Sequence, residues 1–210
     1  MIRVLICDDH TIVREGLKEI LAGTKDIVGA GEASSGDELL DTLEDDDFDV
    51  VLLDISLPGA NGLEVLKRLR ASRPELPVLF LTMHPETHYA VRAMRAGAAG
   101  YLTKGSATTQ LIGAIRKVAS GGRYVSETLA EQLALELLEQ RGRPAREALS
   151  DREYEVMQAL ARGSTVTEIG EHLHLSVKTI STYRTRILHK LGLKNTAEIV
   201  HYALREGIIE

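Results

Sequence analysis

Short apolar runs and amphipathic helical segments alternate five times along the first 120 residues of the chain. Two of the runs, VVLLD at 50–54 and VLFLT at 78–82, are apolar over nearly their whole length, as strands buried on both faces are. Such alternation favours a parallel sheet that is covered by helices on both sides. The other predicted strands are 3–7, 26–33 and 100–102, and the predicted helices are 11–22, 36–44, 62–71, 86–96 and 108–120.

The pattern changes after a connector at residues 123–148, which holds an amphipathic helix at 127–140 and a polar linker at 141–148. From residue 149 onward no strand pattern remains, and helix-start signatures recur. We therefore predict an α/β domain at 1–122 and an all-α, four-helix domain at 149–210. The predicted capping-box pairs are Ser150 with Glu153, Thr165 with Glu168 and Asn195 with Glu198, and Ser176 is predicted to begin a further helix.

The net charge of −6 argues against nucleic-acid binding when it is taken over the whole chain. The distribution of charge along the chain, however, indicates a basic surface in the C-terminal part. Residues 1–125 carry 14 basic and 18 acidic residues, whereas residues 146–210 carry nine of each. No acidic residue occurs between Glu171 and Glu198, and a solvated helix usually mixes both signs. This stretch therefore indicates a surface that binds polyanions. Its basic residues are Lys178, Arg184, Arg186, Lys190 and Lys194.

Several other classes of protein are disfavoured by the sequence. No apolar run approaches the roughly 20 residues of a membrane span, and the N-terminus lacks the apolar stretch of a secretory signal. The single cysteine, Cys7, lies in an apolar run and has no partner for an internal disulfide. We therefore expect a cytoplasmic protein without a membrane partner.

Polar side chains stand at the ends of four of the predicted strands. Asp8 and Asp9 follow the first strand, Asp54 the third, Thr82 the fourth and Lys104 the fifth. In a doubly wound sheet, ligands bind beyond the carboxyl ends of the strands, so these groups should converge there. Three carboxylates in one crevice need a cation, and oxygen ligands suit Mg²⁺.

This set of groups is suited to hold a phosphoryl group on a carboxylate. Asp54 would be the nucleophile, Thr82 would donate a hydrogen bond, and Lys104 would neutralise the phosphate charge. Each residue alone has an ordinary interpretation, as a turn residue, a helix cap or a solvated lysine. Their coincidence at successive strand ends favours the functional interpretation.

Residues 1 to about 122, with these five residues and the turn LPGANG at 57–62, resemble the receiver domain of bacterial response regulators. The resemblance implies a flavodoxin-like sheet of strand order 2-1-3-4-5, with Asp54 as phosphoacceptor, Thr82 as the switch hydroxyl and Tyr101 as an aromatic switch residue. It also implies Mg²⁺ as cofactor. The implied metal ligands are Asp9, Asp54 and the backbone carbonyl of Ser56, with Asp8 acting through water. Gly105 and Met83 depart from residues that are frequent in this family.

The C-terminal part combines a capping serine, a basic face and an apolar stripe, which suit a helix that enters the major groove. The stripe consists of Val177, Ile180, Ile187, Leu188 and Leu191. The runs LSDREYEVMQALARG (149–163) and TVTEIGEHLHLSVKTISTYRTRILHKLGLKNTAEIV (165–200) are similar to the LuxR/NarL-type helix-turn-helix domain. The resemblance implies base contacts by Ser181, Thr182 and Thr185, and phosphate contacts by Lys178, Tyr183, Arg184, Arg186 and Lys190. Ser181, Tyr183 and Gly170 differ from residues common in that family.

Together the two resemblances identify the chain as a member of the NarL/FixJ family of two-component response regulators. They imply a sensor histidine kinase, double-stranded promoter DNA and a second copy of the chain as partners, with RNA polymerase as a further candidate contact. A candidate surface for dimer formation is the helix at 195–206, through Ile199, Val200, Tyr202, Ala203 and Leu204. The chain is expected to catalyse only its own phosphorylation and dephosphorylation.

Three alternatives are open at this point. An aspartate-dependent phosphohydrolase usually carries a second acid two residues after the nucleophile, where this chain has Ser56. A regulator that works without phosphorylation would show a degenerate pocket, whereas all five pocket residues are present. A quorum-sensing LuxR protein would have an aromatic-rich ligand domain, whereas this chain has no tryptophan.

Overall fold

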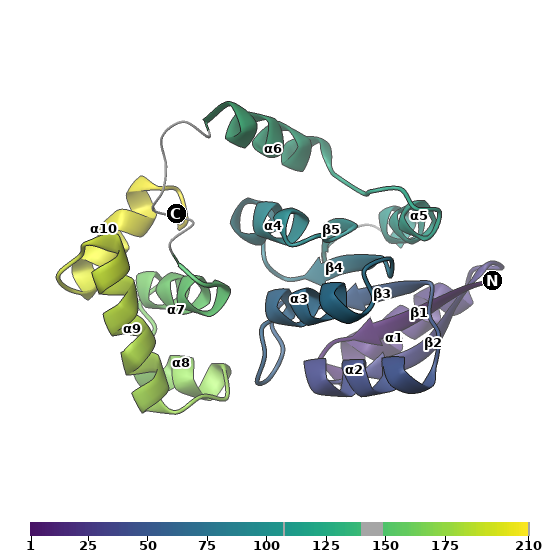
Figure 1. Ribbon diagram of the computed structural model, residues 1–210, viewed down its shortest axis with the longest axis horizontal. Helices are drawn as coiled ribbons and strands as arrows, with labels where there is room; N and C mark the ends of the chain where they lie inside the picture. The colour runs from purple at the N-terminus through teal and green to yellow at the C-terminus, as the bar shows by residue number, and fades with distance from the viewer. Residues whose placement is uncertain (107, 140–148, 210) are drawn as a thin grey trace. The chain divides into compact units, whose positions relative to one another are not determined.

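The computed structural model describes residues 1–106, 108–139 and 149–209 (Figure 1). The chain divides into two compact units, Met1–Ala134 and Leu135–Glu210. The linker predicted at 141–148 lies outside the described residues. Among the helices that are described, none combines the length and the apolarity that a membrane crossing requires.

The first unit is built on a five-stranded parallel sheet of order β2-β1-β3-β4-β5, as predicted (Figure 1). The strands also fall where the sequence placed them, within one residue at each end. They are β1 (Ile2–Cys7), β2 (Ile27–Ala33), β3 (Val50–Leu53), β4 (Val78–Thr82) and β5 (Gly100–Thr103). The helices that follow them are α1 (Thr11–Ala22), α2 (Gly36–Asp45), α3 (Gly62–Ser72), α4 (Glu86–Arg95) and α5 (Thr108–Ala119).

Both faces of this sheet are buried, which explains why its central strands are apolar at successive positions. Val4 and Leu52 belong to a core cluster that also contains buried residues of α1 and α5. Side chains alternate between the faces of a strand, so Leu5 and Leu53 point the opposite way, and both are fully buried. The helices α2, α3 and α4 cover this second face (Figure 1).

The chain covers the free edge of β5 after α5 ends. Tyr124 donates its N–H to the carbonyl of Ala99 at 2.8 Å, and it forms an isolated parallel bridge with Gly100. Ser126 then caps α6 (Glu127–Glu139) by accepting a hydrogen bond from the N–H of Leu129. The Ser126 hydroxyl also donates to the carboxylate of Glu86, the first residue of α4. The start of the connector is therefore fastened to α4.

Over residues 149–209, which the structure describes, the chain forms four helices, as predicted: α7 (Asp151–Ala161), α8 (Val166–His172), α9 (Val177–Leu191) and α10 (Thr196–Arg205). The capping boxes at Ser150 and Thr165 are both present. The predicted capping box at Asn195 is wrong in one detail. Asn195 does accept a hydrogen bond from the N–H of Glu198, but the Glu198 carboxylate accepts from the N–H of Lys194 instead of that of Asn195.

Helix α9 packs on α7 and α8 through Ile180 and Ile187, which are fully buried. A side chain at Gly170 in α8 would come within 2.8 Å of the carbonyl oxygen of Leu175, so glycine permits the close turn between α8 and α9. The predicted apolar stripe is wrong at its first residue. Val177 is 46% exposed.

The turn after Asp54 requires a glycine at the start of α3, which gives a first prediction. A Cβ atom at Gly62 would overlap the carbonyl oxygen of Asp54 and lie 2.9 Å from the Cα of Ile55, and neither backbone atom can move freely. Gly62→Ala should therefore lower the free energy of unfolding by about 3 kcal/mol, as measured by thermal or urea unfolding.

Gly113 in α5 provides the matched control, because nothing lies within 4 Å of a Cβ atom there. Gly113→Ala should raise stability by about 0.5–1 kcal/mol, since alanine is the better helix former. Equal stability of the two alanine variants would contradict the proposed backbone clash.

Candidate functional site

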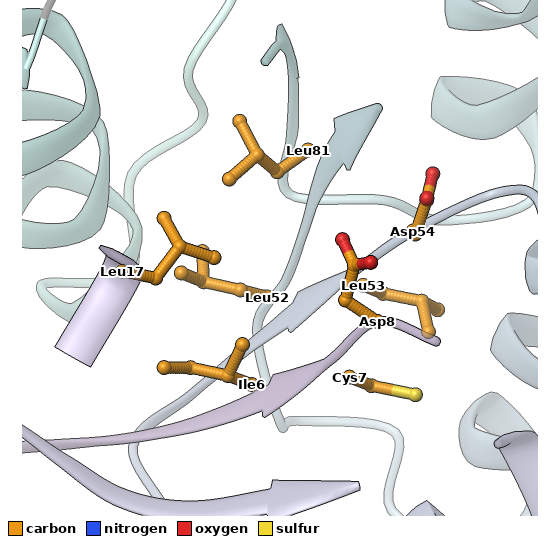
Figure 2. Close-up of a pocket in the computed structure, with 8 residues that line it drawn as sticks. All are labelled: Ile6, Cys7, Asp8, Leu17, Leu52, Leu53, Asp54 and Leu81. Atoms are coloured by element: carbon orange, nitrogen blue, oxygen red, sulfur yellow. The ribbon is translucent and has the colours of Figure 1, made fainter. Parts of the chain in front are cut away.

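The carboxyl ends of β1 and β3 bring two aspartates side by side. Cys7 and Leu53 are paired in register, and the N–H of Asp54 donates to the carbonyl of Cys7 at 2.9 Å. Asp8 and Asp54 therefore leave the sheet together, and Figure 2 shows their carboxyl groups next to each other. Their exposed fractions are only 2% and 4%.

An apolar pocket adjoins these two carboxyl groups (Figure 2). It is lined by Ile6, Cys7, Leu17, Leu52, Leu53 and Leu81 in addition to the two aspartates. Such walls lower the local dielectric constant and strengthen every charge interaction above them. Burial, followed by the negative charges of Asp8 and Asp54, raises the pKa of the Cys7 thiol far above its ordinary value. This thiol is therefore neutral and unreactive.

Lys104 supplies the positive charge that this pair of acids needs. Its Nζ lies 2.6 Å from Oδ2 of Asp8 and 2.7 Å from Oδ2 of Asp54. The backbone N–H of Lys104 donates to the carbonyl of Thr82 at 2.8 Å, which fixes the end of β5 beside β4. Burial alone would lower the pKa of Lys104, but the ion pairs with Asp54 and Asp8 outweigh it and raise the pKa. Lys104 is a permanent cation at neutral pH.

The two oxygens of Asp54 are held in different ways. Oδ1 accepts hydrogen bonds from the N–H of Ile55 at 2.6 Å and of Ser56 at 3.4 Å. Oδ2 faces the ammonium of Lys104. The backbone therefore fixes the orientation of the carboxyl group, and Oδ2 is the oxygen that stands beside a group able to neutralise an incoming phosphoryl charge.

Asp9 lies at the solvent side of the same site, next to a residue that the sequence interpretation missed. Nδ1 of His10 is 2.6 Å from Oδ1 of Asp9 and 3.3 Å from Oδ1 of Asp8. Ligand atoms of these three residues lie within 4.8 Å of one another. The position of His10 directly after two acids was the available signal. The oxygen donors of Asp8, Asp9 and Asp54 fit a hard divalent cation such as Mg²⁺.

A second unforeseen histidine joins the predicted switch residues. The hydroxyl of Thr82, which is fully buried, accepts a hydrogen bond from the N–H of His84 at 3.4 Å. The buried Tyr101 donates its O–H to the carbonyl of His84 at 2.9 Å. Nε2 of His84 and Oγ of Ser56 are 2.9 Å apart. His84 thus links the loop after Asp54 to both Thr82 and Tyr101, a connection that no periodicity in the sequence indicates.

Most of the predicted DNA-contacting residues of α9 are exposed. Lys178, Ser181, Thr182 and Thr185 recur at spacings of three and four residues, so they lie on one face of the helix. Tyr183 and Arg184 lie at the margin of this face and are half-buried. The exposed members are Lys178, Ser181, Thr182, Thr185, Arg186 and Lys190.

Two of the predicted phosphate contacts also fasten α9 within its own domain. Nε of Arg184 donates to Oγ1 of Thr196 at 2.9 Å. Nζ of Lys190 is 2.6 Å from Oε2 of Glu153. Burial would raise the pKa of Glu153, but hydrogen bonds from Lys190 and from the Ser150 N–H outweigh it and lower the pKa. Both cations therefore help to set the orientation of α9 within its domain.

The surface suggested for dimer formation on α10 is largely unavailable. Ile199 and Ala203 are fully buried and Tyr202 is nearly so, in a helix that packs on α7. Leu204, at 49%, is the most exposed of the five residues that were proposed. A helix face that packs into a core and one that packs on a partner show the same 3.6-residue periodicity, and on α10 most of the apolar residues belong to the core.

Comparison with known protein families agrees with this arrangement. Residues 4–116 match the family described as response regulator receiver domain. Residues 147–203 match the bacterial regulatory proteins of the luxR family. The chain is a response regulator of the NarL/FixJ family.

Full-length relatives share both domains with this response regulator. The response regulator UvrY of Escherichia coli strain K12 is 40% identical over 209 residues, covering 99% of this chain and 96% of UvrY. The response regulator GacA of Pseudomonas aeruginosa is 38% identical over 211 residues, covering 100% and 99% of the two chains.

Solved structures of RcsB are similar over nearly the whole chain. RcsB from Salmonella enterica serovar Typhimurium, bound to promoter rprA in the presence of phosphomimetic BeF₃⁻, has a TM-score of 0.65 and 28% identity. It covers 96% of this chain and 98% of the other. An RcsB–DNA complex has a TM-score of 0.61 and 29% identity, with 96% of each chain covered.

The charge arrangement of the pocket yields a prediction about Lys104. Lys104→Met would leave two buried carboxylates facing each other, so the free energy of unfolding of this response regulator should fall by about 3 kcal/mol at pH 7. Thermal unfolding at pH 7 measures this loss.

Lys25→Met is the control for this substitution, because Lys25 is exposed and makes no ion pair with the described residues. It should unfold like the wild type. A Lys104→Met variant as stable as Lys25→Met at pH 7 would show that Lys104 does not offset the buried charges.

The ion pair on the recognition helix yields a prediction with a defined pH window. The folded-state pKa of Glu153 lies below its ordinary value of 4.5, so the stabilisation is complete above pH 4.5 and is lost as the pH falls further. Lys190→Met should therefore cost about 1 kcal/mol at pH 7 and much less near pH 3. The control is Lys194→Met, at an exposed lysine, and a pH-independent difference between the two variants would contradict the ion-pair role.

Proposed function

We propose that a sensor histidine kinase phosphorylates this response regulator on Asp54, and that the phosphorylated protein binds promoter DNA as a dimer and controls transcription. The observation that carries the proposal is the position of Lys104, whose ammonium joins Asp54 to Asp8 beside the buried hydroxyl of Thr82. RNA polymerase is the proposed target of regulation at the promoter.

The chemistry of the phosphorylation step follows from the two environments of the Asp54 oxygens. Oδ2 would attack the phosphorus of a phosphohistidine, so that an O–P bond forms while the N–P bond breaks and the leaving imidazole takes up a proton. Lys104 would then pair with a phosphoryl oxygen, and the Thr82 hydroxyl would donate to another. Bound Mg²⁺, held by Asp8, Asp9, Asp54 and the Ser56 carbonyl, would supply further neutralisation of charge.

The pocket favours a signalling role over turnover of external substrates. The position two residues after Asp54 carries Ser56, whose hydroxyl shares a hydrogen bond with His84 and offers no carboxyl group for general acid–base catalysis. We expect the acyl phosphate to be lost only by hydrolysis within the protein. Release of phosphate from a generic phosphomonoester at many turnovers would favour the phosphohydrolase alternative instead.

The C-terminal domain supports DNA as the output. Its recognition helix α9 presents one exposed face with the basic residues Lys178 and Arg186, and no acid interrupts the stretch from 172 to 197. RcsB is seen bound to DNA, and in one structure two RcsB dimers bind two parallel DNAs. A single helix-turn-helix unit buries little surface, so a dimer on paired half-sites is the expected binding species.

A contact path leads from the pocket toward the connector. His84 touches Thr82 and Tyr101, and Glu86, two residues further on, accepts a hydrogen bond from Ser126 at the start of α6. We propose that a phosphoryl group recruiting Thr82 and Lys104 shifts the loop at His84 and so changes how α4 holds α6. A coupling of a few kcal/mol between the two states suffices to shift most of the population.

The proposal predicts the behaviour of an Asp54→Asn variant. With Mg²⁺ and acetyl phosphate, the full-length wild type should acquire one hydroxylamine-labile phosphoryl group, dimerise and bind its DNA at least about tenfold more tightly. Asp54→Asn should show none of these changes. Mass spectrometry, sedimentation and gel-shift titration measure the three effects separately.

Asp41→Asn serves as the control, because Asp41 is an exposed acid of α2 away from the site, and it should respond like the wild type. Equal DNA affinity of the wild type and Asp54→Asn in the presence of the phosphodonor would favour a regulator that works without phosphorylation.

A further inference from the structure

Helix α9 begins with an apolar side chain that its own domain leaves about half exposed. Val177 is the first residue of α9, and it is 46% exposed although Ile180, one turn later, is fully buried. An isolated exposed valine would need no explanation. This one, however, lies at the N-terminal end of the recognition helix, the part that contacts base edges in helix-turn-helix proteins.

Two exposed threonines of α9, Thr182 and Thr185, have their hydroxyl protons engaged within the helix. Oγ1 of Thr182 donates to the carbonyl of Lys178 at 2.9 Å, and Oγ1 of Thr185 donates to the carbonyl of Ser181 at 3.0 Å. These hydroxyls therefore have no proton left for an acceptor on a base. What each threonine still offers is a methyl group and oxygen lone pairs.

The first two and a half turns of α9 thus present three methyl-bearing side chains, those of Val177, Thr182 and Thr185. In the major groove, the C5-methyl group of thymine is the apolar group on a base edge, and it is contacted by apolar side chains and by threonine methyl groups. Lys178 and Ser181, which are also exposed, supply donors for hydrogen bonds to neighbouring bases or phosphates.

We propose that Val177 is a specificity-determining residue of this response regulator, and that it recognises thymine methyl groups together with the methyl groups of Thr182 and Thr185. Each half-site would then contain thymines at the positions that face these side chains. The inference rests on the proposed DNA-binding function and specifies which chemical feature of the DNA is read.

Replacement of thymine by uracil isolates this feature, because uracil lacks the methyl group and keeps every hydrogen-bonding atom. The probe is the duplex that the full-length protein, treated with acetyl phosphate and Mg²⁺, enriches from a randomised pool. Copies carrying one uracil each are then compared by gel-shift titration. Wild type should lose about three- to fivefold in affinity at one or more thymines per half-site, the effect of burying one methyl group.

Val177→Ala should abolish the thymine preference at one of these positions and leave the others unchanged. Alanine is the better helix former, so the variant should fold at least as well as the wild type. Ile12→Ala, which removes an aliphatic side chain exposed in α1, is the matched control and should keep every thymine preference. At the position that faces Thr182, Thr182→Val should keep the preference, because it retains a methyl group, whereas Thr182→Ser should lose it.

The outcomes separate this inference from the function on which it rests. An enriched duplex whose uracil copies all bind as tightly as the parent would overturn methyl recognition while leaving DNA binding intact. A Val177→Ala variant with an unchanged thymine preference at every position would remove Val177 from the assignment. Failure to enrich any duplex would contradict the DNA-binding function itself and the inference with it.

Discussion

A single ammonium group between two buried carboxylates determines how the first domain can work. Lys104 holds Asp8 and Asp54 at distances of 2.6 and 2.7 Å, above apolar residues that exclude water. Two acids in such surroundings would repel each other strongly without a shared cation. The strand register of β1 and β3 places the acids together, and the contact between β4 and β5 places the lysine opposite them. The sheet topology thus serves this one arrangement of charges.

Much of this arrangement could be predicted from sequence because its signals are local. Strands that are apolar throughout and helices with regular apolar spacing located the elements within a residue or two. Parallel strand order then made the groups after each strand converge, so that Asp8, Asp54 and Lys104 could be placed together without coordinates. The capping boxes at Ser150 and Thr165 were predictable for the same reason, because their partners lie three residues apart.

What could not be predicted depends on contacts between distant residues. His84 joins Ser56 to Tyr101 through loops whose course no periodicity describes. Val177 and Ile180 are both aliphatic and lie three residues apart, yet one is exposed and the other fully buried, a difference that their spacing and residue type do not reveal. Most of the α10 stripe proposed as a dimer surface is core, because a helix face that packs inward and one that packs on a partner have the same sequence pattern.

The shared ammonium also explains why phosphorylation of Asp54 should require a divalent cation. In the structure described, Lys104 serves both Asp8 and Asp54. A phosphoryl group on Asp54 replaces one negative charge by nearly two, and it draws the same ammonium toward its oxygens. Asp8 is then left buried with a weakened partner, and Asp9 adds a further charge nearby. A lysine cannot neutralise all of these groups at once, whereas an ion bound by their oxygens can. The negative charge that phosphorylation adds should also draw the Thr82 hydroxyl, a hydrogen-bond donor, toward the site, and with it the loop at His84, whose N–H is bonded to Thr82.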